Sequence, residues 1–363
     1  MRNDELNRYR GKPICDMHIH PHVQMPVDET VEVIRSVMEY FHDERIVLES
    51  LPSYDVINNF TTLYCKSKLD GVYAGLGLLH RFDGSDTAES YLAQAESLFR
   101  MGCDGFKMLE GKPDYRKRLE KPLDDRVFDR FYGFAEEKGL PVVMHVGDPR
   151  EFWDADRIPR WALERGWLYD DSFVPFRDGH REVEGVLRKF PKLKLVLAHF
   201  FFVSDDLSYA EWIMNEWDGV CFDLTPGSEM YFNFSERIDD WRGFFRRYAD
   251  RILFGSDIYN WRRGDSSLEE RYAHAVNLTR SFLEKKGPFL NRWQNVEMKN
   301  AFGFCSEVLD KICHDNFIRV FGEERRAADD EYIAFCAAGF GRDRDLSEEQ
   351  TANLKKIADW FGR

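Results

Sequence analysis

The sequence predicts a single (β/α)8 barrel, an α/β fold of eight parallel strands joined by helices, with a short C-terminal helical extension. Three observations predict it. Short apolar runs alternate with longer amphipathic stretches, about eight such units follow one another, and 363 residues can form one such barrel. The alternative is an open, doubly wound sheet. No GxGxxG follows the first apolar run, and eight strands suit closure, so we favour the barrel.

The predicted strands are short and rich in Val, Ile, Leu or Phe, as expected of strands buried on both faces. We place them at residues 14–20, 45–51, 72–78, 104–109, 141–146, 193–199, 219–224 and 251–257. Helical patterns lie between them. Residues 28–40 open with acidic side chains, whereas 86–101 and 124–138 stop at Gly102 and Gly139, a common position for glycine after a helix.

Two of the predicted connections are long and aromatic. Residues 147–179 and 225–239 follow the fifth and seventh strands, at the end of the barrel where enzymes of this fold build their sites. Trp153, Trp167 and Tyr231 are therefore candidates for contact with a substrate under a lid. The alternative is that these rings pack the loops down or meet a second chain, as in a homodimer.

The C-terminal part of the chain is predicted to be helical. Helices are expected near 268–285 and 305–317, and a surface helix at 347–361, where Ser347 and Gln350 have capping-box spacing. No linker and no repeat other than the strand–helix alternation is evident. We therefore predict one domain over residues 1–363, with the barrel at 14–322 and the extension at 323–363.

Charge and cysteine content exclude several classes of partner. Lys and Arg number 51 against 65 Asp and Glu, a net charge of −14, whereas binding to a phosphate backbone needs a basic face. The first ten residues lack the apolar core of a secretory signal, and no apolar run is long enough to span a bilayer. Seven cysteines without a CxxC pair are expected to be reduced thiols of a cytoplasmic protein.

Histidines gather at the ends of predicted strands. In the first strand, ICDMHIH, alternation points both His18 and His20 into the barrel, and neutral imidazoles suit a transition metal. His145, His199 and Asp257 end the fifth, sixth and eighth strands. One buried histidine is commonly a hydrogen-bonded core residue. Agreement among four strands is hard to assign to packing, and it predicts a metal site at the carboxyl end of the barrel.

Three further polar residues lie on predicted strands. Lys107 shares the inward phase with Gly105 and Leu109, so it needs a partner, which is either the site or a carboxylate such as Asp257. Glu49 and Asp223 are candidates for substrate contact or for pairing with inward cations.

This ordered set of residues resembles the amidohydrolase superfamily of metal-dependent hydrolases, and more closely its amidohydrolase 2 branch, which also contains nonoxidative decarboxylases. The superfamily's HxH motif corresponds to His18 and His20, and its later ligands to His145, His199 and Asp257. The stretches LDDRVFDRFYGFAEEKGLPVVMHVGDP, RYADRILFGSD and VLDKICHDNFIRVFG resemble segments of that branch. The likeness runs from residue 14 to about residue 322.

The resemblance implies a divalent metal ion held by His18, His20, His145 and Asp257. We expect zinc, with manganese or iron as alternatives. In binuclear members a carbamylated lysine at the place of Lys107 bridges two ions. In the amidohydrolase 2 branch that lysine can stay unmodified beside one ion, and we favour one ion here. Lys107 would then be free to polarise a substrate.

These residues predict a hydrolase in which a divalent ion activates water to attack an amide, ester or lactone-type carbonyl of a small molecule. Asp257 would act first as general base and then as general acid, and His199 would orient the water or polarise the carbonyl. An alternative keeps the metal but decarboxylates an aromatic or unsaturated acid, with Asp257 protonating carbon. A third interpretation is a metal-binding barrel without catalysis.

Overall fold

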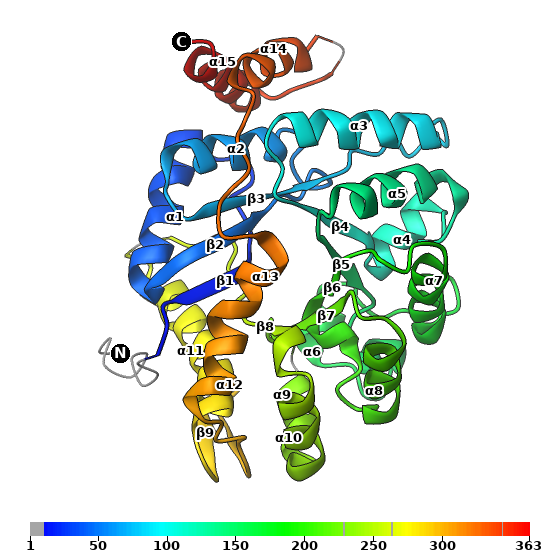
Figure 1. Cartoon of the computed structure of the whole chain (residues 1–363), viewed down its shortest axis with the longest axis vertical. Helices are drawn as coiled ribbons and strands as arrows, with labels where there is room; N and C mark the ends of the chain where they lie inside the picture. The colour runs from blue at the N-terminus through cyan, green and yellow to red at the C-terminus, as the bar shows by residue number, and fades with distance from the viewer. Residues whose placement is uncertain (1–10, 228, 263, 343) are drawn as a thin grey trace.

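The computed structural model describes residues 11–227, 229–262, 264–342 and 344–363. Eight parallel strands pair in sequence order and helices flank them (Figure 1). The strands are β1 Ile14–Ile19, β2 Asp43–Glu49, β3 Val72–Gly77, β4 Gly105–Gly111, β5 Val142–Val146, β6 Leu195–Leu197, β7 Val220–Asp223 and β8 Ile252–Leu253. The ring closes beside β1, where Met17 N donates to Phe254 O at 3.1 Å and Asp257 N to His18 O at 2.8 Å. The predicted barrel is confirmed.

The barrel interior has an apolar layer beneath a polar one. The apolar layer is one buried cluster of strand residues with the side chains of a C-terminal helix, namely Cys15, Met17, Val47, Tyr73, Val143, Val196, Cys221, Leu253, Phe317, Val320 and Phe321. Two residues further along their strands, the same face carries Glu49, His145 and Asp223. The apolar layer therefore closes the amino end of the barrel and supports polar groups at the carboxyl end.

Helices cover the outside of the barrel and follow its last strand. They are α1 Val27–Phe41, α2 Asn58–Lys68, α3 Ala88–Arg100, α4 Pro113–Leu119, α5 Asp129–Lys138, α6 Arg160–Leu163, α7 Phe176–Lys189, α8 Leu207–Glu216, α9 Met230–Glu236, α10 Ile238–Arg247, α11 Ser266–Glu284, α12 Ser306–Asp310 and α13 Asn316–Phe321. A π-helical turn, Lys311–Asp315, joins α12 to α13. A two-stranded hairpin, β9 Phe289–Asn291 with β10 Val296–Met298, was absent from the predicted elements.

Two predicted strands are shorter than their apolar patterns indicated. β6 ends at Leu197, and residues 199–202 turn back with φ between 52° and 57°. β8 holds only Ile252 and Leu253, although the backbone stays paired with β1 as far as Ile258. Hydrophobicity shows where a chain is buried, but not where its backbone leaves the strand conformation. His199 and Asp257 therefore stand just beyond their strands.

The extension forms two helices, α14 Asp330–Phe340 and α15 Glu348–Phe361, which lie against α2 (Figure 1). The capping box at Ser347 and Gln350 is confirmed. Leu354, Ile357 and Phe361 are buried, so α15 packs as part of the molecule. Among the residues described, no helix combines the length and apolarity that a membrane span requires. All seven cysteines lie in the described part of the chain, and none is in a disulfide.

Candidate active site

A bulge in β1 brings both of its histidines into the polar layer. The three-residue step from Asp16 to Ile19 in β1 lies opposite a two-residue step from Ile46 to Leu48 in β2. A bulge re-aims the side chains that follow it and is common beside active sites. It explains how Cys15 and Met17 line the apolar layer while His18, one residue later, still contacts the inward-facing Lys107.

His18 is held from behind by β7. Its Nδ1 donates to Asp223 Oδ2 at 2.8 Å and lies 3.0 Å from Thr225 Oγ1. Asp223 also accepts the backbone N–H of His199 at 2.7 Å, so one buried carboxylate orients two elements of the site. Gly255 makes this approach possible, because a Cβ there would lie 2.5 Å from Thr225 Oγ1. The Nε2 of His18 is thereby directed into the site, as in the carboxylate–histidine arrangement behind many metal ligands.

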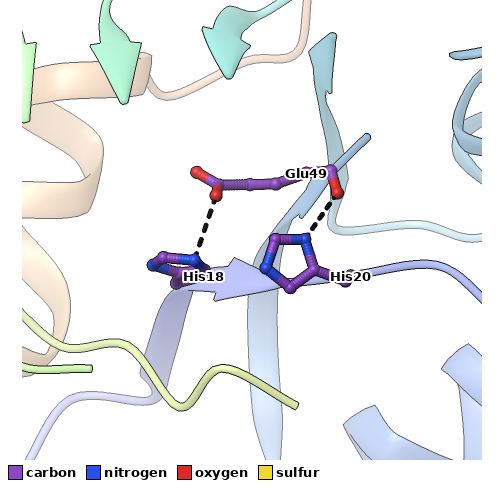
Figure 2. Close-up of side chains that lie close together, drawn as sticks. All are labelled: His18, His20 and Glu49. Atoms are coloured by element: carbon purple, nitrogen blue, oxygen red, sulfur yellow. Dashed lines mark hydrogen bonds and ion pairs between the residues drawn. The ribbon is translucent and has the colours of Figure 1, made fainter. Parts of the chain in front are cut away.

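His20 is held by β2. Its Nδ1 donates to the backbone oxygen of Glu49 at 2.8 Å (Figure 2). Its Nε2 lies 3.3 Å from Asp257 Oδ1. The Nε2 of His18 lies 3.8 Å from the same carboxylate oxygen. Both imidazoles thus direct Nε2 toward Asp257. Burial lowers the pKa of His18 well below its usual value, and the charge of Lys107 lowers it further, so this ring is neutral at pH 7.

Glu49 and Lys107 form a buried ion pair beside His18. Lys107 Nζ lies 2.5 Å from Glu49 Oε2 and 2.9 Å from His18 Nε2. Glu49 Oε2 is itself 3.3 Å from His18 Nε2 (Figure 2). Burial raises the pKa of Glu49 to about 7, against the opposing charge of Lys107. Glu49 Oε1 is buried without a hydrogen-bond partner among the described residues. The predicted need of Lys107 for a carboxylate is met by Glu49 in place of Asp257.

His145 and His199 complete a group of four imidazoles. Their ring centres are 4.8 Å apart, and that of His199 is 5.4 Å from that of His18. His145 Nε2 donates to Gly147 O at 2.9 Å, which leaves the lone pair on Nδ1. Burial lowers the pKa of both rings, that of His199 to about 4. These residues are therefore neutral imidazoles, the form that binds a metal.

Asp257 is the carboxylate at the open side of the group. Its side chain is 33% exposed and its φ is 57°, a left-handed conformation that is uncommon outside glycine and concentrates at functional sites. Burial opposes its charge, but the adjacent His20, with His18 and His199 nearby, holds its pKa well below the usual range. Asp257 is therefore an ionised acceptor with access to solvent.

The donor set fits a divalent metal ion. One ligand atom from each of His18, His20 and Glu49 lies within 4.8 Å of the others, and all three residues are buried. Imidazole nitrogen and carboxylate oxygen suit zinc, iron and manganese. A cluster of buried imidazoles beside a carboxylate oxygen that lacks a donor is costly without such a partner. Glu49 thus lies beside the two histidines of the predicted metal site, and of its two expected roles the pairing with an inward cation, Lys107, is present.

Asp223 and Tyr231, two candidates for substrate contact, are buried and hydrogen-bonded within the protein. Asp223 stands behind His18 and is fully buried. Tyr231 is 2% exposed, and its hydroxyl is 3.0 Å from Leu224 O and 2.7 Å from Thr279 Oγ1. Internal hydrogen bonds therefore account for the burial of both side chains.

The long loop after β5 packs on itself. Phe152 and Tyr169 are buried in a small cluster of its own, against which Trp153 and Trp167 pack. Trp153 Nε1 donates to Val174 O at 3.2 Å. The packing that sequence analysis gave as an alternative is thus present, and substrate contact by these rings stays a prediction.

A buried charged group that sequence analysis missed joins this loop to the site. Lys112 Nζ donates to Asp148 Oδ2 at 2.6 Å, and the Tyr169 hydroxyl donates to the same oxygen at 2.5 Å. Asp148 Oδ1 lies 3.4 Å from His145 Nε2, and Lys112 Nζ is 4.6 Å from the ring centre of Trp167. In the sequence, only the position of Asp148 three residues after His145 indicated that it lies near the site.

Comparisons with known proteins agree with this geometry. A family model described as amidohydrolase matches residues 15–322. A search of curated protein sequences found no significant match. At such low identities, the following likenesses to solved structures show the fold.

The 2,6-dihydroxybenzoate decarboxylase of Rhizobium is 16% identical with a TM-score of 0.50, covering 85% of this chain and 98% of that one. The 4-oxalomesaconate hydratase of Rhodopseudomonas palustris is 16% identical with a TM-score of 0.51, covering 85% and 95%. The apo IDCase of Metarhizium anisopliae is 13% identical with a TM-score of 0.53, covering 88% and 98%.

Proposed function

This chain belongs to the amidohydrolase family, a family of metal-dependent enzymes, and on that premise we propose that it is a hydrolase of small molecules with one divalent ion at the barrel mouth. The ion is zinc, with manganese or iron as alternatives. The substrate carries an amide, ester or lactone-type carbonyl. His18, His20, His145 and Asp257 would hold the ion.

One observation carries the proposal: the Nε2 atoms of His18 and His20 are both aimed at Asp257 by partners behind them. Asp223 Oδ2 accepts a hydrogen bond from His18 Nδ1, and the Glu49 carbonyl oxygen accepts one from His20 Nδ1, both at 2.8 Å. Fixing the tautomer in this way directs the two Nε2 lone pairs to the side of the site, where Lys107 Nζ lies 2.9 Å from that of His18. A packing role for two core histidines would not require both rings to face one ionised carboxylate at 3.3 and 3.8 Å.

The proton transfers fall to residues of the chain. A divalent ion supplies a lowered pKa to nearby water and polarises a carbonyl oxygen. Asp257, ionised and partly exposed, accepts the proton of the attacking water and then delivers it to the leaving group. His199, neutral and within the ring of imidazoles, orients the water or donates to the carbonyl oxygen.

The Lys107–Glu49 pair supports the single-ion proposal. A carbamate on Lys107 would replace the ammonium, whose Nζ lies 2.5 Å from the buried Glu49 Oε2, by an anionic group. Two like charges so close together in a dry site repel strongly. An unmodified Lys107 keeps Glu49 paired, and it leaves an N–H donor to polarise a substrate.

Decarboxylation of an aromatic or unsaturated acid is the second candidate. It is supported by the aromatic cluster after β5, in which Trp153 packs on Tyr169 and Trp167 on Lys112, the two partners of Asp148. The fold likeness to a 2,6-dihydroxybenzoate decarboxylase supports it as well. In this reaction Asp257, which is ionised at rest, would first take a proton from water and then deliver it to the carbon that loses carbon dioxide.

Zinc-loaded protein tests both reactions. We expect hydrolysis of members of an ester, lactone and amide panel, lost on chelation and restored by zinc. Carbon dioxide release from aromatic acids such as 2,6-dihydroxybenzoate, without hydrolysis of the panel, would establish the second candidate. Asp257→Asn should abolish turnover and keep most of the zinc, because three imidazoles remain. Unchanged turnover of this variant would end the mechanism.

A further inference from the structure

We propose that α15, in the C-terminal extension, is a positioning element of the active-site mouth, with Asn353 and Gln350 as its positioning residues. The helix lies beyond the residues matched by the family model, which end at 322. It holds the two loops that leave β1 and β2. The inference goes beyond the proposed function, because it holds whichever reaction the site performs.

Asn353 supplies the cap that α1 lacks. The residue before α1 is Pro26, whose side chain makes no capping hydrogen bond. The first backbone N–H of the helix, at Val27, donates to Asn353 Oδ1 at 3.1 Å. Asn353 Nδ2 in turn donates to Met25 O at 2.9 Å, and Asn353 is buried. An N-terminal N–H needs such an acceptor. Here the acceptor comes from the other end of the chain.

Gln350 reaches the second loop through Asp55. Gln350 Nε2 donates to Asp55 Oδ1 at 2.8 Å. The same oxygen accepts Ile57 N at 3.2 Å, and Asp55 Oδ2 accepts Gln24 N at 3.1 Å. Asp55 therefore links the loop after β2, the loop after β1 and the first turn of α15. Loss of the Gln350 contact loosens both loops.

The loop after β1 borders the candidate site. It begins directly after His20, and its His22 Nε2 donates to Trp261 O at 2.7 Å, on the segment after Asp257. Asn58 Nδ2 donates to His22 O at 3.3 Å and connects the loop to the start of α2. The segment from 20 to 26 is therefore held at four places, by Trp261, Asn58, Asp55 and α15.

The loop after β2 borders the site as well. It begins directly after Glu49 and carries the exposed ring of Tyr54. Leu51 N donates to Asn58 Oδ1 at 2.7 Å, which ties the start of this loop to α2. A shift of residues 50–57 would move Tyr54 relative to Asp257.

The helix is anchored firmly enough to act as a support. Leu354, Ile357 and Phe361 are buried against the body of the protein. Trp360 Nε1 donates to Ser67 Oγ on α2 at 2.9 Å. These contacts fix α15 on α2, so its polar residues present hydrogen-bonding groups to the loops from a fixed position.

Hydrogen–deuterium exchange of the full-length protein tests the proposal. Asn353→Ala should speed exchange in peptides covering 20–30 by about fivefold, the factor that corresponds to ~1 kcal/mol for a lost cap. Gln350→Ala should do the same for 50–58. Asn353→Asp keeps the acceptor for Val27 N–H but loses the donor to Met25 O, so it should speed exchange in 20–30 less than Asn353→Ala does. Lys355→Ala, an exposed position of the same helix, is the matched control and should change nothing.

Zinc affinity distinguishes loop positioning from damage to the ligands. The metal-site histidines of β1 are held by the sheet, so zinc dissociation constants of both alanine variants should stay within about twofold of the wild type. A uniform rise of exchange in the barrel strands, unchanged exchange in both loops, or a tenfold loss of zinc affinity would each overturn the proposal. Failure of the wild type to bind zinc would contradict the proposed function, whereas the exchange result would still decide the role of α15.

Discussion

Asp223→Asn changes only one atom of the side chain that orients His18, and its effect follows from geometry. Asp223 Oδ1 accepts two backbone donors, His199 N at 2.7 Å and Thr225 N at 3.1 Å. Asp223 Oδ2 accepts His18 Nδ1–H at 2.8 Å. An asparagine keeps one acceptor oxygen, and the two backbone donors claim it. Its NH2 group then faces His18 Nδ1 and must donate to it.

The magnitude follows from the tautomer. When His18 Nδ1 accepts, its proton moves to Nε2, the nitrogen that lies 2.9 Å from Lys107 Nζ and faces the site. A protonated Nε2 cannot bind a metal. In the other amide orientation the NH2 group faces the backbone N–H groups of His199 and Thr225. Each of these buried donors then lacks an acceptor, at a cost in stability of about 1–3 kcal/mol. We therefore expect zinc affinity to fall about 10- to 100-fold, which is about 1.4–2.8 kcal/mol.

Competition with a chromophoric chelator measures the zinc dissociation constant, and circular dichroism with thermal unfolding establishes that the variant is folded. Thr225→Val is the matched control. It removes the hydroxyl 3.0 Å from the same Nδ1 and leaves the Asp223 carboxylate in place, so its affinity should stay within about threefold. A folded Asp223→Asn protein with wild-type zinc affinity would refute the assignment of His18 Nε2 as a ligand atom.

Three further predictions concern stoichiometry, stability and pH. Zinc-loaded protein should hold one ion per chain without added CO2 by native mass spectrometry of the intact protein, and two ions with a carbamate would contradict the single-ion proposal. Tyr231→Phe should lower the free energy of unfolding by about 1–2 kcal/mol through the lost internal hydrogen bonds and leave KM unchanged; a raised KM would support substrate contact. Burial lowers the pKa of His180 and His199 to about 4. As pH falls from 6.5 toward 4 the unfolded chain binds protons that the folded state does not, so the metal-free protein should lose up to about 3 kcal/mol for each, measured by denaturant unfolding. His180→Gln should flatten this dependence, and an equal slope would contradict it.

The sequence by itself determined the barrel and most of the polar layer. Period-two alternation places Glu49, Lys107, His145 and Asp223 on the inward phase of their strands, and a parallel barrel brings the carboxyl ends of all strands to one mouth. His18 needed more than alternation, because the bulge in β1 decides its direction. The strand order and the chemistry at the mouth are therefore consequences of local pattern and chain connectivity.

Only the tertiary structure decided which polar groups meet. Glu49 neutralises Lys107, Asp223 orients His18, and Asn353 caps a helix that begins at Val27. Each contact joins residues far apart in sequence, and each is satisfied by a hydrogen-bonding group whose partner no periodicity specifies. The left-handed turn at His199 is equally invisible, because it depends on where the backbone leaves the sheet. Hydrophobic pattern sets the depth at which a side chain lies, whereas the need of buried polar groups for partners is settled only when distant segments come together.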